Sequence, residues 1–366
     1  MKKILILTAA FGEGHNSAAR GIRAGLARAR GATARVEVHD VFSNTYGLAN
    51  TVAREAYLGL INQWPNAWAV VYRWLDRQER FAGDFRLFFS AKKQLRRLLD
   101  EFEPDVIVSV YPAYPHILDE MLGPSGRGRG KRVVVITDSL SVNAIWYRGS
   151  ADYYLLPNAE SAAVLHRAGI GPEKTRTFGF PVSPEFADVA RLRAAPADGY
   201  PRHVLYLVNA RQATAPELAL RLATVPGIQL TVAVGRDQRV RAAIDKVRAL
   251  APHPFELVGW SEELPRLLRS SHLLISKAGG ATVQEALAAG CPMVVNHVIP
   301  GQEEGNARYL VEMNAGAIAT TTDEVIAAVE SAFAHDAAQW HEWSANSARL
   351  GRPGAALETA EFLLSL

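Results

Sequence analysis

The sequence predicts an α/β protein made of two doubly wound, parallel-sheet domains. Three observations lead to this class. The chain has 366 residues, which is more than one ordinary hydrophobic core accommodates. Short aliphatic runs alternate with longer amphipathic segments, the pattern of buried strands and covering helices. Turn-forming residues gather near the middle of the chain, where the periodicity lapses.

The short apolar runs are the expected strands, and the segments between them are the expected helices. In chain order the runs are 4–7, 106–110, 133–136, 204–208, 230–234, 273–275 and 293–295. The opening MKKILILTAA ends in a glycine turn without a small-residue cleavage pattern, so we expect a buried strand there and no signal peptide. No stretch approaches the ~20 apolar residues that a membrane-crossing helix needs, so any membrane contact is expected to be peripheral.

The turn-rich stretch sets the expected domain boundaries. We expect a front domain over 1–180, a linker over 181–199 and a back domain over 200–335. A C-terminal helical segment over about 340–366, interrupted by Gly-Arg-Pro-Gly at 351–354, is expected to pack back on the front domain. The two domains are expected to face each other across a cleft, with a ligand at the carboxyl ends of the strands.

The composition restricts the class of protein, its compartment and the kind of partner it meets. Hydrophobic residues make up 49% of the chain and charged residues 21%, which excludes fibrous and disordered classes. The single cysteine, Cys291, excludes an internal disulfide framework and a cysteine-rich metal site, so a cytoplasmic location is expected. Residues 1–150 hold 21 Lys and Arg against 14 Asp and Glu, whereas the rest holds 19 against 23. This asymmetry indicates that the front half meets an anionic surface, either phosphate-rich lipid or nucleic acid.

The first candidate motif follows the first expected strand. Gly12 and Gly14 permit a tight turn, and the helix behind them presents unpaired N–H groups to an oxyanion or phosphate. His15 lies at the mouth of the expected cleft, where a histidine can deprotonate an attacking hydroxyl. A plain structural turn, with His15 capping the helix, is the alternative.

The second motif is more specific and spans residues 276–306. A strand ends at Ser276, a double glycine turns the chain, and the first turn of the next helix can hold a diphosphate through main-chain N–H groups. Glu285, further along that helix, is placed to receive two ribose hydroxyls. The polar stretch over 300–306 follows the next strand, where the hydroxyls of a sugar would need partners.

The third feature combines aromatic and basic residues over 57–97. Three of the seven tryptophans fall within eleven residues, and residues 73–97 hold eight basic and three acidic side chains. Such surfaces lie in the headgroup layer of anionic membranes, although aromatics that fill the core between helices are the alternative. No recognised nucleic-acid module accompanies the basic residues, so we expect no nucleic-acid partner. The residues expected to contact the membrane or acceptor are Trp64, Trp68, Tyr72, Arg73, Trp74, Arg77 and Arg80.

These motifs together resemble glycosyltransferase family 28. KAGGATVQEALAAGCPMVV with IPGQEEGN resembles the donor-binding half of that family, and ILTAAFGEGHNSAA is similar to its Gly-x-Gly-His opening. Within the family, the chain is most similar to processive diacylglycerol glycosyltransferases and monogalactosyldiacylglycerol synthases, and the likeness runs from Ile4 to about Phe333. The resemblance implies a GT-B type fold, a UDP-sugar donor and a lipid acceptor, diacylglycerol first among them.

The resemblance also assigns roles to individual residues. His15 is the implied general base, with Asp138 as the alternative. The diphosphate is implied to lie on Gly279, Gly280 and Thr282, and the ribose on Glu285. The sugar is implied to contact Gln302, Glu303 and Asn306. Val258, Gly259 and Trp260 are implied to border the uracil, with base contacts partly from the main chain. The remaining implied donor-side residues are Gly12, Gly14, Asn209, Arg211, Lys277, Pro300 and Gly301.

One departure from the family pattern bears on the donor. The family places a glycine-rich loop at the start of the back domain, whereas this chain has Asn209-Ala-Arg211-Gln-Ala213 there. Arg211 can grip a phosphate bidentately in compensation, or the change indicates another donor, lower activity or a different reaction.

The expected mechanism uses no metal and no cofactor. The sequence has no Asp-x-Asp motif and no His/Cys cluster, so glycine-turn N–H groups and the helix dipole are expected to neutralise the leaving diphosphate, with inversion at the sugar. The expected location is the inner face of the cell membrane. The open alternatives are another lipid-linked acceptor, a UDP-sugar epimerase or hydrolase, and a non-catalytic binding protein.

Overall fold

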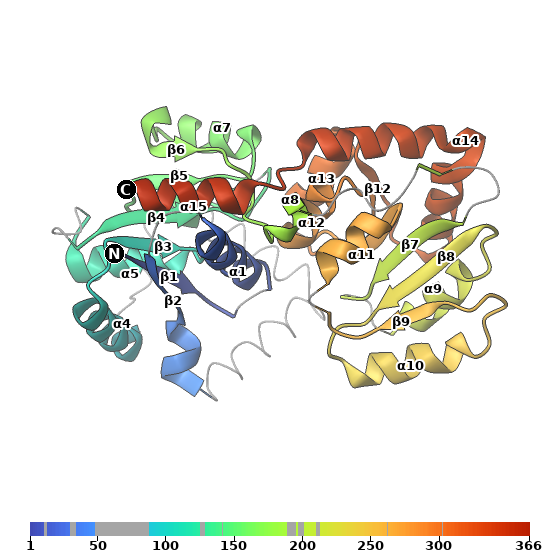
Figure 1. Cartoon of the computed structure of the whole chain (residues 1–366), viewed down its shortest axis with the longest axis horizontal. Helices are drawn as coiled ribbons and strands as arrows, with labels where there is room; N and C mark the ends of the chain where they lie inside the picture. The colour runs from blue at the N-terminus through green and yellow to red at the C-terminus, as the bar shows by residue number, and fades with distance from the viewer. Residues whose placement is uncertain are drawn as a thin grey trace. The chain divides into compact units, whose positions relative to one another are not determined.

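The computed structural model describes residues 1–10, 13–29, 34–47, 88–124, 129–140, 142–188, 195–196, 201–209, 213–261, 263–301 and 303–366. These residues form two compact units (Figure 1). Unit 1 comprises Met1–Pro184, Ile299–Gly305 and Gly354–Leu366, and unit 2 comprises Glu185–Val298 and Asn306–Pro353.

Unit 1 is built on a parallel six-stranded sheet in the order β2-β1-β3-β4-β5-β6. Its strands are β1 (Lys2–Thr8), β2 (Ala34–Asp40), β3 (Val106–Ser109), β4 (Lys131–Val135), β5 (Tyr153–Leu155) and β6 (Thr175–Arg176). Its helices are α1 (Glu13–Arg28), α4 (Phe89–Phe102), α5 (Ala113–Leu122), α6 (Ile145–Arg148), α7 (Ala159–Arg167), the short 3₁₀ helix η3 (Pro172–Lys174) and α15 (Ala355–Ser365). Strands β1 and β3 are almost wholly buried, as expected of a sheet covered on both faces.

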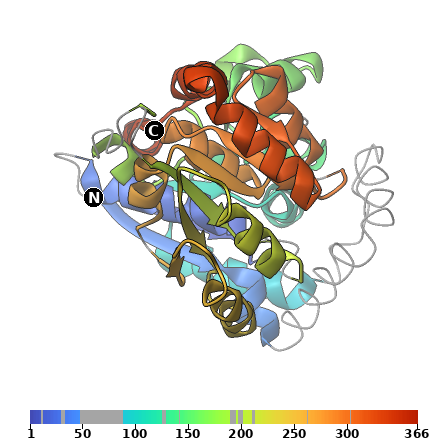
Figure 2. The same ribbon diagram turned by 90° about the vertical axis from the view of Figure 1, so that its right-hand side faces the viewer.

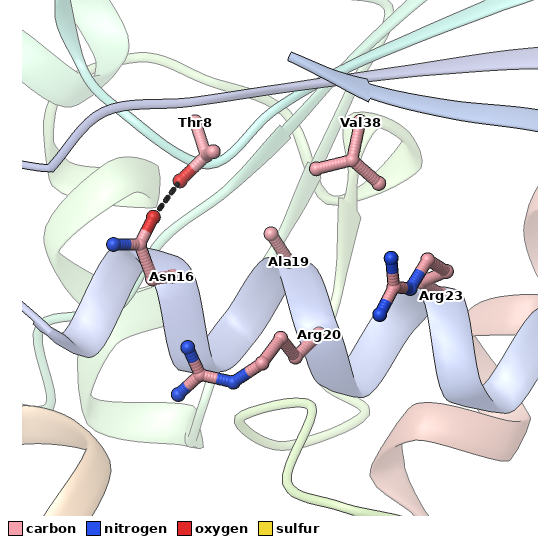
Figure 3. Close-up of a pocket in the computed structure, with 6 residues that line it drawn as sticks. All are labelled: Thr8, Asn16, Ala19, Arg20, Arg23 and Val38. Atoms are coloured by element: carbon pink, nitrogen blue, oxygen red, sulfur yellow. Dashed lines mark hydrogen bonds between the residues drawn. The ribbon is translucent and has the colours of Figure 1, made fainter. Parts of the chain in front are cut away.

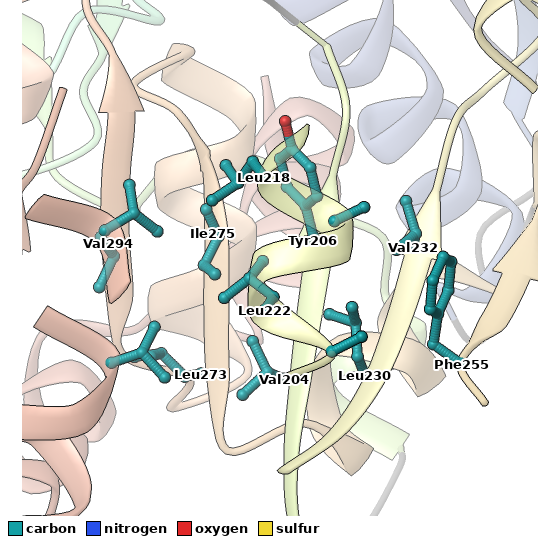
Figure 4. Close-up of a cluster of buried hydrophobic side chains, with 14 of the residues drawn as sticks. Val204, Tyr206, Leu218, Leu222, Leu230, Val232, Phe255, Leu273, Ile275 and Val294 are labelled. Atoms are coloured by element: carbon teal, nitrogen blue, oxygen red, sulfur yellow. The ribbon is translucent and has the colours of Figure 1, made fainter. Parts of the chain in front are cut away.

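Unit 2 is built on a second parallel six-stranded sheet, in the order β12-β11-β10-β7-β8-β9. Its strands are β7 (Arg202–Leu207), β8 (Ile228–Ala233), β9 (Glu256–Val258), β10 (Leu273–Lys277), β11 (Met293–His297) and β12 (Gly316–Ile318). Its helices are α8 (Glu185–Asp188), α9 (Ala215–Leu222), α10 (Gln238–Arg248), α11 (Leu264–Ser270), α12 (Gly280–Ala288), α13 (Glu304–Glu312, whose first two residues fall in unit 1) and α14 (Thr322–Leu350). Aliphatic side chains of β7, β8, β10 and β11 pack with α9 in its core (Figure 4).

Both sheets are parallel and doubly wound, which confirms the predicted α/β class. In each, the strand order changes direction once, between β1 and β3 in unit 1 and between β7 and β10 in unit 2. In open α/β sheets, ligands bind beyond the carboxyl ends of the strands at such a switch point. The topology therefore marks one candidate site in each unit.

The C-terminal region is helical with an interruption at 351–354, as expected, since α14 ends at Leu350 and α15 begins at Ala355. The part before the interruption, however, does not pack on unit 1. Trp340 and Trp343 on α14 are buried in the core of unit 2, so residues 340–350 belong to that unit. Helix α14 has non-helical backbone angles from Ala334 to Ala337, and its two parts run in different directions (Figure 2). Only α15 lies in unit 1, where it packs against α1: a Cβ on Gly25 would lie 2.2 Å from the main-chain oxygen of Ala356.

Candidate functional site

The switch point of unit 1 brings His15 together with the chain that follows β3. His15 is on the first turn of α1, and its ring packs edge-on to Tyr111 with ring centroids 5.2 Å apart. Its Nδ1 is buried and has no hydrogen-bond partner among the described residues. Burial lowers the pKa of His15 to about 4, against a smaller opposing effect of a hydrogen bond to the main chain of Val110. The imidazole is therefore neutral at pH 7.

Asp138 lies after β4 and is tied to the same cluster by Trp146. The indole Nε1 of Trp146 donates a hydrogen bond to Oδ2 of Asp138 over 2.8 Å, and the indole ring lies 5.8 Å from the His15 ring. Burial raises the pKa of Asp138 to about 6, and the Trp146 hydrogen bond partly opposes that shift. The structure thus joins the two predicted bases through one buried tryptophan.

Two buried contacts hold the turn that carries His15. The Tyr114 hydroxyl donates to the Thr8 main-chain oxygen over 2.7 Å and accepts from the Val41 N–H over 3.1 Å, which links the ends of β1 and β2. The Asp40 carboxylate accepts from the Ala10 N–H over 2.8 Å and from Ser43. Three different segments, the ends of β1 and β2 and the start of α5, therefore meet in these bonds and hold the end of β1 that precedes His15.

A pocket lies beside this turn, between α1 and the ends of β1 and β2 (Figure 3). At its inner end the Thr8 hydroxyl donates to Oδ1 of Asn16 over 3.0 Å. Its lining residues are Thr8, Asn16, Ala19, Arg20, Arg23 and Val38. Arg20 pairs with Glu13 over 2.7 Å, so part of its charge is neutralised. The pocket borders the His15 turn through Asn16, one residue along the helix.

The switch point of unit 2 carries the predicted double glycine. Gly279 is the N-cap of α12 and no side chain caps the helix, so its first N–H groups are not consumed by a cap. Before the helix, the Lys277 N–H donates to Oδ1 of Asn209 over 3.3 Å, which joins the chain after β7 to that after β10. An uncapped helix start with positive dipole suits a phosphate group.

The accessible face of α12 consists of the predicted ligands. Six of its nine residues are buried, and the others are Gly280, Thr282 and Glu285. Thr282 and Glu285 are three positions apart and therefore share one side of the helix. The helix start and this face together form a continuous polar surface.

The loop that follows β11 is held by its own polar side chains. The carboxylate of Glu303 accepts from the Ile299 N–H over 3.1 Å, and the amide of Asn306 donates to the Ala278 main-chain oxygen over 3.2 Å. Both residues are 4% exposed. Gly301 adopts a left-handed backbone with φ of +79°, next to Pro300. In this structure Glu303 and Asn306 shape the loop, and their contact with a sugar stays a prediction.

Gly259 and Trp260 follow β9 at the same edge of the sheet. Trp260 is 51% exposed, and the Arg236 guanidinium covers part of its ring at 4.2 Å from the centroid. Sequence reasoning missed Arg236, although it follows a glycine at the end of a strand as the other candidates do. It also gave no role to Tyr111 or Trp146, whose contacts with His15 depend on the fold.

Some predicted residues lie outside the described part of the chain. These are Gly12, Arg211, Gln302 and the membrane set Trp64, Trp68, Tyr72, Arg73, Trp74, Arg77 and Arg80. Gly14 is described, and a Cβ there would meet nothing within 4 Å. Among the helices that the structure describes, none is long and apolar enough to cross a membrane. The described residues also contain no group of three His, Cys, Asp or Glu side chains that could hold a metal ion.

Two family models match most of the chain. Residues 15–182 match the model for monogalactosyldiacylglycerol (MGDG) synthase, and residues 204–351 match the glycosyltransferase family 28 C-terminal domain. The first match includes His15 and Asp138, and the second includes the whole of α12.

Similar proteins extend these matches along nearly the whole chain. The chloroplastic monogalactosyldiacylglycerol synthase of Spinacia oleracea is 26% identical over 375 residues, which cover 97% of this chain and 70% of that protein. The processive diacylglycerol beta-glucosyltransferase of Bacillus subtilis (strain 168) is 24% identical over 350 residues, covering 92% of this chain and 88% of that protein. The crystal structure of Acinetobacter baumannii MurG has a TM-score of 0.64 at 15% identity over all of both chains. The structural likeness confirms the GT-B fold class.

Proposed function

Because the chain belongs to glycosyltransferase family 28, with an N-terminal region of the MGDG synthase type, we propose that it transfers a hexose from a UDP-sugar to diacylglycerol and so makes a glycolipid. The observation that carries the proposal is that each unit has a chemically suited group of residues at its own switch point. One is a buried pair of proton acceptors in unit 1, and the other is an uncapped helix start with a carboxylate in unit 2. The names of the similar proteins support the lipid acceptor.

In the proposed reaction, the start of α12 and the loop after β11 hold the donor. The N–H groups at the start of α12 receive the diphosphate, Thr282 and Glu285 face the phosphate and ribose, and the loop after β11 contacts the sugar. The N–H groups and the helix dipole stabilise the charge that develops on the diphosphate as it leaves, and no metal takes part. We base this absence of a metal on the sequence, which has no Asp-x-Asp motif.

Unit 1 supplies the base. The acceptor hydroxyl oxygen forms a bond to the anomeric carbon from the side opposite the diphosphate, the bond between that carbon and the phosphate oxygen breaks, and UDP leaves with the electron pair. The proton of the hydroxyl passes to Nδ1 of His15, whose lone pair has no hydrogen-bond partner among the described residues. The configuration at the anomeric carbon of the sugar is therefore inverted. Asp138 is the alternative base, because its pKa of about 6 lies closer to neutral pH.

The pH dependence separates the two bases. The profile of kcat/KM reports ionisations of the free enzyme. An acid limb near pH 4 corresponds to the pKa of His15, whereas an acid limb near pH 6 corresponds to that of Asp138. A limb near pH 6 that moves in Asp138→Asn would reassign the base.

The test of the whole proposal is a transfer assay with labelled UDP-glucose and UDP-galactose, with and without vesicles that contain diacylglycerol. The expected product is a glycolipid identified by mass, and free sugar or an epimerised UDP-sugar as the sole product would overturn the proposal. His15→Ala is expected to lose transfer by a factor of about 10² to 10⁴ while its UDP affinity is unchanged. His253→Ala, at an exposed histidine of unit 2, is the matched control. Equal loss of transfer and UDP affinity in His15→Ala would contradict the role as base.

We further propose that the enzyme acts at the cytoplasmic face of the cell membrane. The aromatic and basic stretch over 57–97 and the positive charge of residues 1–150 support contact with anionic lipid. Sedimentation with vesicles of increasing anionic lipid content tests this, and binding that is independent of anionic lipid and of salt would contradict it.

A further inference from the structure

Trp146 is a buried side chain that contacts both candidate bases of unit 1, and the proposed reaction gives it no role. It lies on α6 and is 2% exposed. Its indole Nε1 donates to Oδ2 of Asp138 over 2.8 Å, and its ring centroid lies 5.8 Å from that of His15, with the two rings tilted by 51°. A side chain that contacts two functional groups sets the position of each relative to the other.

The short helix α6 that carries this indole is held from several sides. Oδ1 of Asn143 accepts from the Ile145 N–H over 3.1 Å, and Nε2 of His116 donates to the Ile145 main-chain oxygen over 2.8 Å. After the helix, the Tyr154 hydroxyl donates to the Gly149 main-chain oxygen over 2.9 Å. These bonds come from α5, from β5 and from the loop before α6. The position of the indole is therefore set by the surrounding fold.

Asp138 and the indole are held by different neighbours. Ser161, which is wholly buried on α7, donates through its hydroxyl to the Asp138 main-chain oxygen over 2.9 Å. The indole packs with side chains of β4 and α7, among them Val134 and Leu165. Because the main chain of Asp138 and the ring are fixed separately, the hydrogen bond between them holds the carboxylate in one orientation.

The same hydrogen bond favours the charged form of the carboxylate. An indole N–H only donates and an ionised carboxylate only accepts, so the two groups are complementary. Burial raises the pKa of Asp138 to about 6, and the bond from Trp146 partly opposes that shift. Without such a donor, a carboxyl group in the same buried position stays protonated to higher pH.

We propose that Trp146 is the positioning residue of the two proton-accepting groups. Its N–H fixes the orientation of the Asp138 carboxylate and its ring fixes the imidazole of His15, so that both groups keep one arrangement when the lipid hydroxyl reacts. Trp146 acts through these two side chains and takes no proton itself. This inference rests on the proposed function, because it gives a contact within unit 1 a role in the transfer.

Steady-state kinetics of the transfer test this role in two variants of the full chain. Trp146→Phe keeps an aromatic ring beside His15 but loses the N–H, and Trp146→Leu loses both contacts. We expect kcat to fall about tenfold in Trp146→Phe and about a hundredfold in Trp146→Leu, because misplaced reacting groups slow the chemical step. KM for the UDP-sugar is expected to stay within about twofold of the wild-type value, because the donor is proposed to bind at α12.

Trp343→Phe and Trp343→Leu are the matched controls. The Trp343 side chain is 3% exposed in unit 2, and its Nε1 donates to Oδ1 of Asn314 over 3.1 Å. It therefore has similar burial and the same kind of hydrogen bond, but its bond goes to an asparagine outside the group around His15. We expect the free energy of unfolding in urea to fall in both pairs of variants, and kcat to fall only in the Trp146 pair. Wild-type kcat in Trp146→Phe, or an equal loss of kcat in the Trp343 variants, would overturn the positioning role.

A spectroscopic measurement tests the contact itself, independently of the transfer. In protein with ¹⁵N-labelled tryptophan, the indole N–H resonance of Trp146 is the one that is missing from Trp146→Phe. Its chemical shift is expected to titrate with a midpoint near pH 6, which is the pKa of Asp138. This titration is expected to disappear in Asp138→Asn, which leaves the neighbouring histidines His15 and His116 unchanged. A resonance that does not titrate between about pH 4 and pH 8, or that titrates equally in Asp138→Asn, would overturn the inference.

The outcomes separate this inference from the function on which it rests. If the wild type transfers the sugar and Trp146→Phe does so with the same kcat, the role of Trp146 is wrong and the proposed function stands. If the folded wild type transfers no sugar to diacylglycerol, the proposed function fails and the role of Trp146 in the transfer fails with it. The titration of the Trp146 resonance then still shows whether its bond to Asp138 exists.

Discussion

Asp138 combines a functional position with a measurable cost to stability. Its pKa in the folded protein is about 6, compared with 3.8 for the free side chain, because burial disfavours the carboxylate. A pKa that is raised on folding means that the protonated form stabilises the fold, and this stabilisation is lost as the pH rises from 3.8 through 6. At pH 8 the ionised group therefore destabilises unit 1.

The size of the effect follows from the two pKa values. A difference of about 2.2 units corresponds to about 3 kcal/mol at pH 8 and to about 1.5 kcal/mol at pH 5, where the folded group is already mostly protonated. Asp138→Asn removes the charge but keeps an oxygen that accepts from Trp146. We expect the free energy of unfolding of this variant to exceed that of the wild type by up to these amounts at each pH. Its transfer activity is expected to fall if Asp138 is the base.

Urea unfolding of both proteins at pH 5 and pH 8, followed by circular dichroism, measures the difference. Asp152→Asn, at a carboxylate that bonds the Arg132 N–H at the edge of β4, is a control that should not gain stability as the pH rises. If Asp138→Asn raised the free energy of unfolding equally at the two pH values, or lowered it at pH 8, the claim that the buried carboxylate destabilises the fold would be wrong.

Two further changes test the contacts that hold unit 1 around His15. Tyr114→Phe removes a buried hydroxyl that joins Thr8 to Val41, so we expect the free energy of unfolding to fall by about 2 kcal/mol and kcat to fall as well. The control is Tyr153→Phe, because the Tyr153 hydroxyl makes no hydrogen bond among the described residues. Equal effects of the two substitutions would contradict the role of the Tyr114 hydroxyl. Gly25→Ala places a Cβ 2.2 Å from the Ala356 oxygen, so we expect α15 to undock and the amides of residues 355–365 to exchange faster with deuterium. Gly14→Ala on the same helix, where a Cβ meets nothing within 4 Å, is the matched control, and unchanged exchange in Gly25→Ala would refute the docking.

The sequence predicts those parts of the site whose chemistry is local. A glycine turn between a strand and a helix is written in consecutive residues, and both such turns lie at switch points. The accessible face of α12 follows mostly from helical periodicity, because the residues around Thr282 and Glu285 are small or aliphatic and become buried, with the exception of Gln284, which is also buried. Local patterns therefore predict the two glycine turns that the strand order places at the switch points.

The contacts that complete the site join distant segments and leave no local pattern. Tyr114 and Thr8 are 106 residues apart, and Arg236 and Trp260 meet only because β8 and β9 are neighbours in register. The packing of residues 340–350 in unit 2 was missed for a similar reason. The tryptophans at 340 and 343 resemble any apolar helix face, and the core they enter is set by packing.

The groups of residues at the two switch points also differ in the electrostatic environment that they create. Burial lowers the pKa of His15 and raises the pKa of Asp138, so it favours the uncharged form of each side chain. In the proposed reaction, these buried groups of unit 1 receive the proton of the acceptor hydroxyl. At α12, the uncapped helix start and the neighbouring Lys277 present positive potential to an anion. A transfer that begins with a neutral hydroxyl and ends with a diphosphate leaving group needs both environments, one for each charge that develops, and a neutral pocket around the diphosphate would forfeit the stabilisation that drives its departure.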